Sequence, residues 1–119
     1  MKSAAERDCF ALIQQISLLQ DPRCIVCGEP SSAGHHVFGR GLAVAFELEM
    51  VRGLCEKHHI PFAHKQPEAF KAFFMAFIGG PRHYERLKRK SREIIPYMDF
   101  EMKRVELRAI LADLQKRAA

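Results

Sequence analysis

Two short pairs of metal-binding residues constrain this chain more than any other feature. The first pair is Cys24-x2-Cys27, and the second, much later in the chain, is Cys55-x2-His58. Zinc prefers four tetrahedral ligands of the thiolate and imidazole type, and two short chelating pairs supply them with little strain. Zinc held in this way would stabilise a small core. The sequence therefore predicts a structural zinc site formed by Cys24, Cys27, Cys55 and His58.

The cysteines leave other interpretations open. An even number of cysteines is compatible with disulfides in a secreted protein, but the first residues are charged and lead into no long apolar segment. We therefore expect a cytoplasmic protein, in which disulfides are rare. Three unligated buried cysteines are one alternative to zinc. A redox pair at Cys24 and Cys27 is a weaker one, because it would leave Cys55 and His58 without a role.

The charge of the chain favours a polyanionic partner, and its hydropathy argues against a membrane protein. The chain has 119 residues, with 19 Lys and Arg against 14 Asp and Glu, which gives a formal net charge of +5. A basic excess suits a polyanionic partner. No apolar stretch approaches the roughly 20 residues of a membrane span, so we expect no membrane partner. A chain of this length is expected to form a single domain over residues 1–119.

The N-terminal residues 3–20 have the pattern of an amphipathic helix. Ser3 and Glu6 show the spacing of a capping box, and apolar residues follow at helical intervals. Asp21-Pro22 ends the pattern, because proline lacks an N–H and restricts the residue before it. Cys9 on the apolar face is expected to be a small buried hydrophobe.

The region over 23–66 predicts a small core that contains β-structure. A tight turn at 24–28 leads into turn residues, and 33–38 would return as the second strand of a short hairpin. The segment 42–54 is ambiguous between strand, buried loop and helical turn. A short helix is expected to begin at Cys55.

Helices are also expected from 67 to 119. Residues 67–78 form one, between Pro67 and Gly79-Gly80, with a core face of phenylalanines. Residues 97–117 form the last one, whose apolar stripe would pack on 3–20 or form a homodimer. That stripe consists of Met98, Met102, Val105, Ala109 and Ala112, with Leu107, Ile110, Leu111 and Leu114 nearby. Together these patterns predict an α+β fold, mostly helical, in which an N-terminal helix and a C-terminal helical arm flank a small zinc core.

A basic run over 82–92 predicts a contact with nucleic acid. It contains one acid among its cations, and it could track a phosphate backbone, so that affinity falls with salt. The alternative is a solvated helix face. Its cationic residues are Arg82, Arg86, Lys88, Arg89, Lys90 and Arg92.

Four histidines near the predicted zinc ligands have no structural role: His35, His36, His59 and His64. A zinc ion with four protein ligands has no open coordination position and cannot activate water. These four imidazoles, which the zinc does not need, would therefore serve another purpose. His35 and His36 would point to opposite faces of a strand. The alternative is that some of them, His64 above all, are surface residues or core hydrogen-bond donors.

Taken in order, these residues resemble the HNH endonuclease family, also called ββα-metal nucleases, in its zinc-stabilised treble-clef form. The resemblance covers residues 24–70. It rests on Cys24-x2-Cys27, on His35-His36-Val37-Phe38-Gly39-Arg40 and on Gly53-Leu54-Cys55-x2-His58-His59. Small phage and prophage-type nucleases of this family also run their last zinc pair directly into a metal-binding residue. This implies an intracellular protein that is bacterial or phage-encoded.

The resemblance implies a role for each position that matches the family motif. The two cysteine-containing pairs match the structural zinc ligands. His36 matches the general base, and His35 and His59 match ligands of a catalytic divalent cation. His64 matches a further ligand that some members have. Arg40 lies where a basic residue often contacts phosphate.

The implied reaction is metal-dependent hydrolysis of phosphodiester bonds in DNA. A neutral imidazole with a pKa near 6.5 can take a proton from water at physiological pH, and one divalent cation would stabilise the leaving oxygen. Imidazole ligands favour Mn²⁺, Ni²⁺ or Zn²⁺, with Mg²⁺ as a further candidate. The expected products carry 5′-phosphate and 3′-hydroxyl ends, as in the family.

One position departs from the family pattern. The middle Asn of the motif corresponds to Met50, and the chain contains no Asn. Glu47 or Glu49, the nearest carboxylates, could take over its loop-bracing or metal-binding task. The departure favours an alternative function, a non-catalytic zinc module that binds DNA or RNA through the same scaffold. A third hypothesis is a zinc-stabilised adaptor that binds proteins through its last helix.

Overall fold

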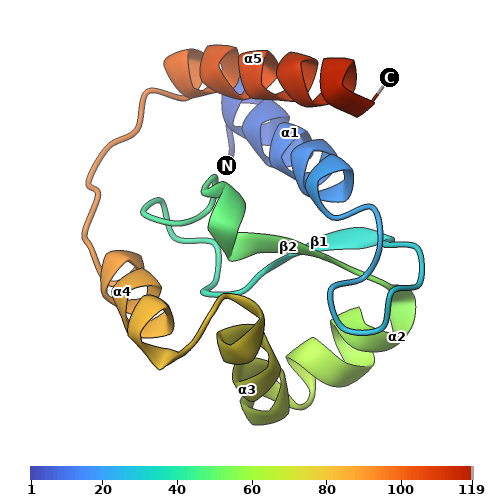
Figure 1. The fold of residues 1–119 in the computed structure, drawn as a ribbon. Helices are drawn as coiled ribbons and strands as arrows, with labels where there is room; N and C mark the ends of the chain where they lie inside the picture. Colours follow the sequence, from blue (N-terminus) through green and yellow to red (C-terminus); the bar gives the residue numbers. More distant parts are fainter. Residues whose placement is uncertain (119) are drawn as a thin grey trace.

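Within residues 1–118, which the computed structural model describes, helices surround a small antiparallel sheet (Figure 1). The elements in chain order are α1 (Ala4–Gln20), β1 (Ala33–His36), the 3₁₀ turn η1 (Leu48–Met50), β2 (Val51–Leu54), α2 (Glu56–His58), the π-helical segment η2 (His59–His64), α3 (Pro67–Phe77), α4 (Pro81–Ser91) and α5 (Phe100–Ala118). The expected α+β class is therefore confirmed. No helix in this part of the chain combines the length and the apolarity that crossing a membrane requires.

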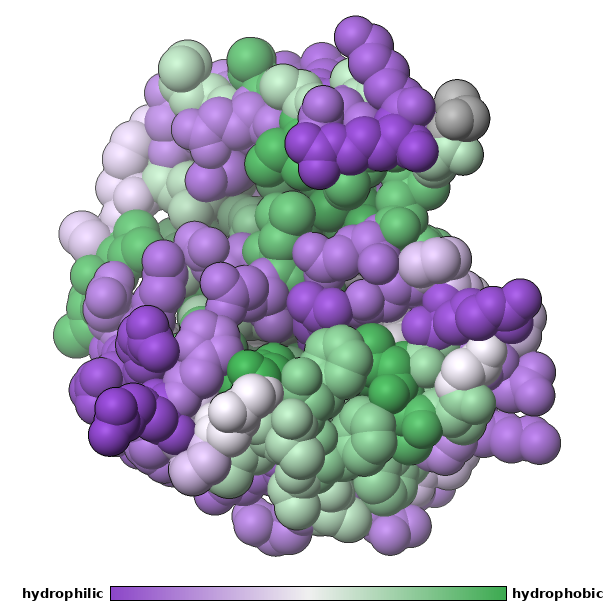
Figure 2. Space-filling model, viewed as in Figure 1, coloured by the Kyte–Doolittle hydropathy of each residue, from purple (hydrophilic) through white to green (hydrophobic). Residues whose placement is uncertain are grey.

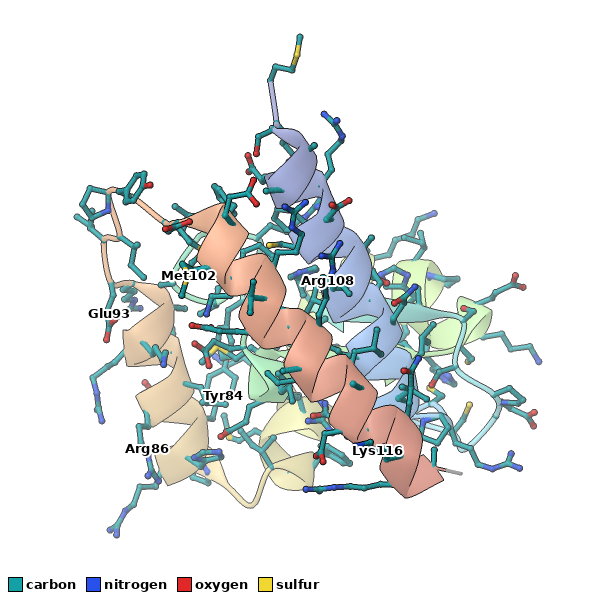
Figure 3. The ribbon with its side chains drawn as sticks, turned by 90° about the horizontal axis from the view of Figure 1, so that it is seen from above. Tyr84, Arg86, Glu93, Met102, Arg108 and Lys116 are labelled. Atoms are coloured by element: carbon teal, nitrogen blue, oxygen red, sulfur yellow. The ribbon has the colours of Figure 1, made fainter. Side chains whose placement is uncertain are left out.

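The first and last helices, α1 and α5, run side by side in the same direction (Figures 1 and 3). Ser3 caps α1 as predicted, because its Oγ accepts a hydrogen bond from the backbone N–H of Glu6 at 3.1 Å. An apolar cluster lies between the two helices and includes Cys9, Ile13 and Leu107, all of them buried. Burial of this apolar surface is what stabilises the helix pair.

The buried face of α5 is not the stripe that the sequence predicts. Met102 and Val105 from that stripe are 59% and 61% exposed, whereas Leu107 is 1% exposed. Ile110, Leu111 and Leu114 pack beside Leu107 on the side of α1. The predicted stripe contains alanines, so it offers less apolar area for burial than the stripe with leucine and isoleucine.

The sequence predicted that the strand at 33–38 pairs with the segment directly before it in a hairpin, and this prediction is wrong. β1 pairs antiparallel with β2, in a register that puts His36 opposite Val51. The tight turn before β1 does form, but outside the named strands the described residues contain one isolated bridge, between Arg23 and Pro30. Pro30 has no N–H to donate, so the ladder cannot continue in the usual way from that residue.

A buried carboxylate joins the end of α1 to β2. Asp21 accepts hydrogen bonds from Arg52 Nη2 at 2.7 Å and from the backbone N–H of Gly53 at 2.9 Å. A Cβ at Gly53 would collide with the backbone oxygen of Asp21, so this approach requires glycine. The contact fixes β2, and through the sheet also β1, relative to α1.

A second apolar cluster lies on the side of α3 and α4. Phe70 and Phe74 of α3 are buried in it together with Tyr84 and Leu87 of α4. Phe77, which the sequence assigned to the same core face, is instead exposed. Figure 2 accordingly shows apolar residues gathered on the surface over α3 and hydrophilic residues over α4.

Candidate metal centres and catalytic cavity

The two predicted zinc pairs come together in one group. Cys27 Sγ lies 3.6 Å from Cys55 Sγ, and His58 Nδ1 lies 3.3 Å from Cys55 Sγ and 3.9 Å from Cys24 Sγ. A tetrahedral zinc ion with bonds of about 2.3 Å to sulfur and about 2.0 Å to nitrogen separates its ligand atoms by about 3.5–3.8 Å. The four side chains therefore fit a metal ion such as zinc.

The backbone around Cys24 favours its ionised form. Burial opposes ionisation, but the backbone N–H groups of Cys55, Cys27 and Val26 outweigh it, so that the pKa of the Cys24 thiol is lowered. The turn that carries Cys24 and Cys27 closes at Gly28, whose φ of +81° is a conformation that glycine adopts readily. Since zinc binds thiolates, this loop is suited to a metal ligand.

Three of the remaining histidines form a second group. The ring centroids of His35, His59 and His64 lie 4.8–5.3 Å from one another, and the Nε2 atoms of His59 and His64 are 3.1 Å apart. Two nitrogens on one ion with bonds of about 2.1 Å are separated by about 3.0–3.4 Å. One ligand atom from each side chain lies within 4.8 Å of the others, so the group could hold a cation.

The π-helical segment η2 explains how two of these ligands meet. In a π-helix the backbone bonds residues five apart, and the Lys65 N–H donates to the carbonyl oxygen of Ile60 at 3.2 Å. His59 and His64 are also five residues apart, so one turn presents both imidazoles on the same side. The third member, His35, comes from β1.

Burial favours the neutral form of two histidines in this group, His35 and His59. Burial, followed by the nearby imidazoles of His59 and His64, lowers the pKa of His35 to about 4. Burial and then His64 also lower the pKa of His59. The neutral imidazole is the form that binds metal ions, so His35 and His59 need no deprotonation at physiological pH. Three protein ligands leave coordination positions for water or substrate.

His36 lies outside the three-histidine group but lines the same cavity. Its Nε2–H donates to the carbonyl oxygen of Ala45 at 3.1 Å, which leaves Nδ1 as an acceptor. Burial lowers the pKa of His36; the bond to Ala45 acts in the opposite direction, and the charges of Arg40 and Lys2 add to the lowering. The cavity has a volume of about 590 Å³ and is lined by His35, His36, His59, His64, Gln14 and Arg40, among others.

Gln14 of α1 is a site residue that the sequence analysis missed. Its Nε2 donates to the carbonyl oxygen of Gly34 at 2.9 Å, and its Oε1 accepts from the N–H of Gly34 at 2.8 Å. This pair of bonds holds β1 against α1 directly before His35. A polar residue between the apolar residues Ile13 and Ile16 was the available signal.

The carboxylates proposed to replace the missing Asn do not belong to the group formed by His35, His59 and His64. Glu49 Oε2 lies 2.9 Å from His83 Nε2, and Glu47 Oε1 lies 3.4 Å from Lys90 Nζ, so both face α4. The metal-binding role suggested for them is therefore wrong, because both acids are paired with side chains of α4 instead. They brace the loop before β2, and Met50 is 2% exposed in the apolar core.

The predicted nucleic-acid contacts occupy two separate surfaces. Arg40 is exposed beside the cavity, with its Cζ 4.2 Å from the ring centroid of Phe10. The basic run forms α4, on which Lys88 is half-buried and Arg82, Arg86, Arg89 and Lys90 are exposed; Arg92, also exposed, follows it. No residue of α4, which is described throughout, lines the cavity. Figure 2 shows hydrophilic residues gathered over α4.

Comparisons with family models, with curated proteins and with solved structures found no match to this chain. The function must therefore be inferred from the two groups of metal-binding side chains and from the cavity that the second group shares with His36.

Proposed function

We propose that this chain is a metal-dependent DNA endonuclease of the HNH type, built around a treble-clef zinc core. The observation that carries the proposal is the cavity in which three imidazoles, suited to a cation, lie beside a fourth imidazole hydrogen-bonded to the backbone. These are the residues through which the sequence resembles that family.

In this proposal His36 is the general base. The Ala45 carbonyl holds its Nε2–H, so the lone pair on Nδ1 is free to accept a proton from a water molecule. The lowered pKa keeps the ring neutral at physiological pH. Because the ring is hydrogen-bonded to the backbone, its orientation is set before substrate binds, which is a requirement for efficient proton transfer.

The three-histidine group would hold the catalytic cation. A divalent ion on His35, His59 and His64 would supply Lewis-acid stabilisation of the phosphate and of the leaving oxygen. Their imidazole ligands suit Mn²⁺, Ni²⁺ or Zn²⁺, and Mg²⁺ remains a candidate. Arg40, at the edge of the same cavity, would contact a phosphate of the bound DNA.

The cysteine group would have a structural task. Zinc on Cys24, Cys27, Cys55 and His58 would join the turn before β1 to α2. Because His59 follows His58 directly, that zinc would also fix the backbone from which a catalytic ligand projects. The zinc site would therefore contribute both to folding and to the arrangement of the cavity.

A second candidate function is a non-catalytic zinc module that binds nucleic acid. It is favoured by Met50, which is buried where the family has Asn, and by Glu47 and Glu49, which face α4. Such a module would bind DNA or RNA without cutting it.

Cleavage of supercoiled plasmid by the zinc-loaded protein separates these candidates. The assay would use Mg²⁺, Mn²⁺ or Ni²⁺, with EDTA as the control and a gel shift run alongside. The endonuclease proposal expects nicked or linear plasmid with 5′-phosphate ends. These products should form only when a divalent cation is present. Salt-sensitive binding without cleavage in any cation would favour the module. Absence of both cleavage and nucleic-acid binding would favour the third hypothesis, an adaptor that binds proteins.

A further inference from the structure

We infer that Lys2, held with Arg40 against the ring of Phe10, binds a phosphate of the DNA backbone beside the catalytic cavity. The inference rests on the proposed function and adds a contact from the segment before α1. The motifs in the sequence do not point to Lys2, because it lies outside the region that resembles the nuclease family.

Two cations approach one aromatic ring at the edge of the cavity. Lys2 Nζ lies 4.1 Å from the ring centroid of Phe10, and Arg40 Cζ lies 4.2 Å from it. The ring of Phe10 lines the cavity, and its centroid is 6.0 Å from that of His36. Both charges are therefore close to the proposed general base.

The backbone of the N-terminal segment is also held in position. Arg7 Nη1 donates a hydrogen bond to the carbonyl oxygen of Lys2 at 2.7 Å. The attraction between each cation and the face of Phe10 limits the directions that the two side chains take. This arrangement reduces the conformational entropy that Lys2 would lose when it binds an anion.

The charges at Phe10 have no acidic partner. Among residues 1–118, neither Lys2 nor Arg40 belongs to an ion pair, whereas Lys90 and Arg104 do. The two cations add positive charge at the edge of the cavity, and this charge attracts anions. DNA supplies such anions along its backbone, and the cavity beside them is where the scissile phosphate would lie.

Fluorescence anisotropy with a labelled DNA duplex tests the inference. The full chain, zinc-loaded and carrying His36→Ala to prevent cleavage, would be compared with the same chain that also carries Lys2→Gln or Arg40→Gln. Each change should weaken binding about 3- to 5-fold and reduce the slope of log K against log salt by about 1. Lys2→Arg should restore the binding that Lys2→Gln loses.

A matched control comes from the opposite end of the helix pair. Lys116, labelled in Figure 3, is exposed on α5 and lies far from the N-terminus, so Lys116→Gln removes the same charge elsewhere. An affinity and salt slope in Lys2→Gln equal to those of Lys116→Gln would overturn the inference. Since Lys2, Arg40 and Lys116 are all exposed, these changes do not threaten folding.

The same measurements separate this inference from the proposed function. A Lys2-dependent affinity together with no plasmid cleavage by the wild-type chain would support the phosphate contact and contradict the nuclease. If the wild type cleaves plasmid and Lys2→Gln leaves the affinity for DNA unchanged, only the phosphate contact is contradicted. Absence of salt-sensitive DNA binding by the His36→Ala chain would contradict both.

Discussion

His58 and His59 are neighbours in the chain, yet their imidazoles belong to different groups of side chains. His58 Nδ1 lies 3.3 Å from Cys55 Sγ, whereas His59 Nε2 lies 3.1 Å from His64 Nε2. The backbone changes from α-helix to π-helix at this bond, and the two side chains diverge there. A metal ion in the cysteine group would therefore fix the backbone of a ligand in the other group.

This adjacency gives a matched pair of substitutions. His58→Ala removes one of the four proposed zinc ligands, so we expect a chain that loses zinc and unfolds at a lower temperature, because zinc binding supplies folding free energy. His59→Ala should keep its zinc and its fold. Elemental analysis after gel filtration, with thermal unfolding followed by circular dichroism, measures both. Equal zinc content in the two variants would contradict the division into two groups.

The second group should bind its own cation. We expect the zinc-loaded chain to take up about one further Mn²⁺, because three imidazoles converge there. His59→Ala and His64→Ala should each weaken that binding by tenfold or more, on the order of 1.4 kcal/mol. Electron paramagnetic resonance of free Mn²⁺ gives the affinity. His83→Ala, on α4 and paired with Glu49, serves as the control; a loss as large in this control would argue against the site.

Local signals in the sequence were sufficient for most helix ends and for the cysteine group. Ser3 and Pro67 act on the residues next to them, so the starts of α1 and α3 could be predicted. Each zinc pair likewise lies within one turn of the backbone. Such features depend little on the rest of the fold.

Relationships between distant segments were not predictable from the same signals. β2 lies in 42–54, whose pattern fits several local structures, so its pairing with β1 was missed. Glu47 and Glu49 turn toward α4 because the tertiary fold brings Lys90 and His83 to them. The meeting of His59 and His64 depends on a π-helical segment, and their spacing fits an α-helix only loosely.

Thiol labelling tests whether Cys9 is independent of the proposed zinc site. Cys9 is fully buried between α1 and α5, and burial raises the pKa of its thiol, so it stays protonated and unreactive at pH 8. We expect a chelator to expose three reactive thiols and a denaturant to expose the fourth. Cys9→Ala should leave the first three unchanged. Simultaneous reaction of all four thiols with chelator alone would contradict a separate α1–α5 cluster.

The most direct test of the whole account is the rate of plasmid cleavage by His36→Ala in saturating Mn²⁺. The variant keeps both groups of metal-binding side chains, so zinc content and Mn²⁺ affinity should equal those of the wild type. Loss of a general base predicts a rate about 10²- to 10⁴-fold lower than that of the wild type. A variant that cleaves at the wild-type rate with both metals bound would contradict the role of His36 and the nuclease mechanism built on it.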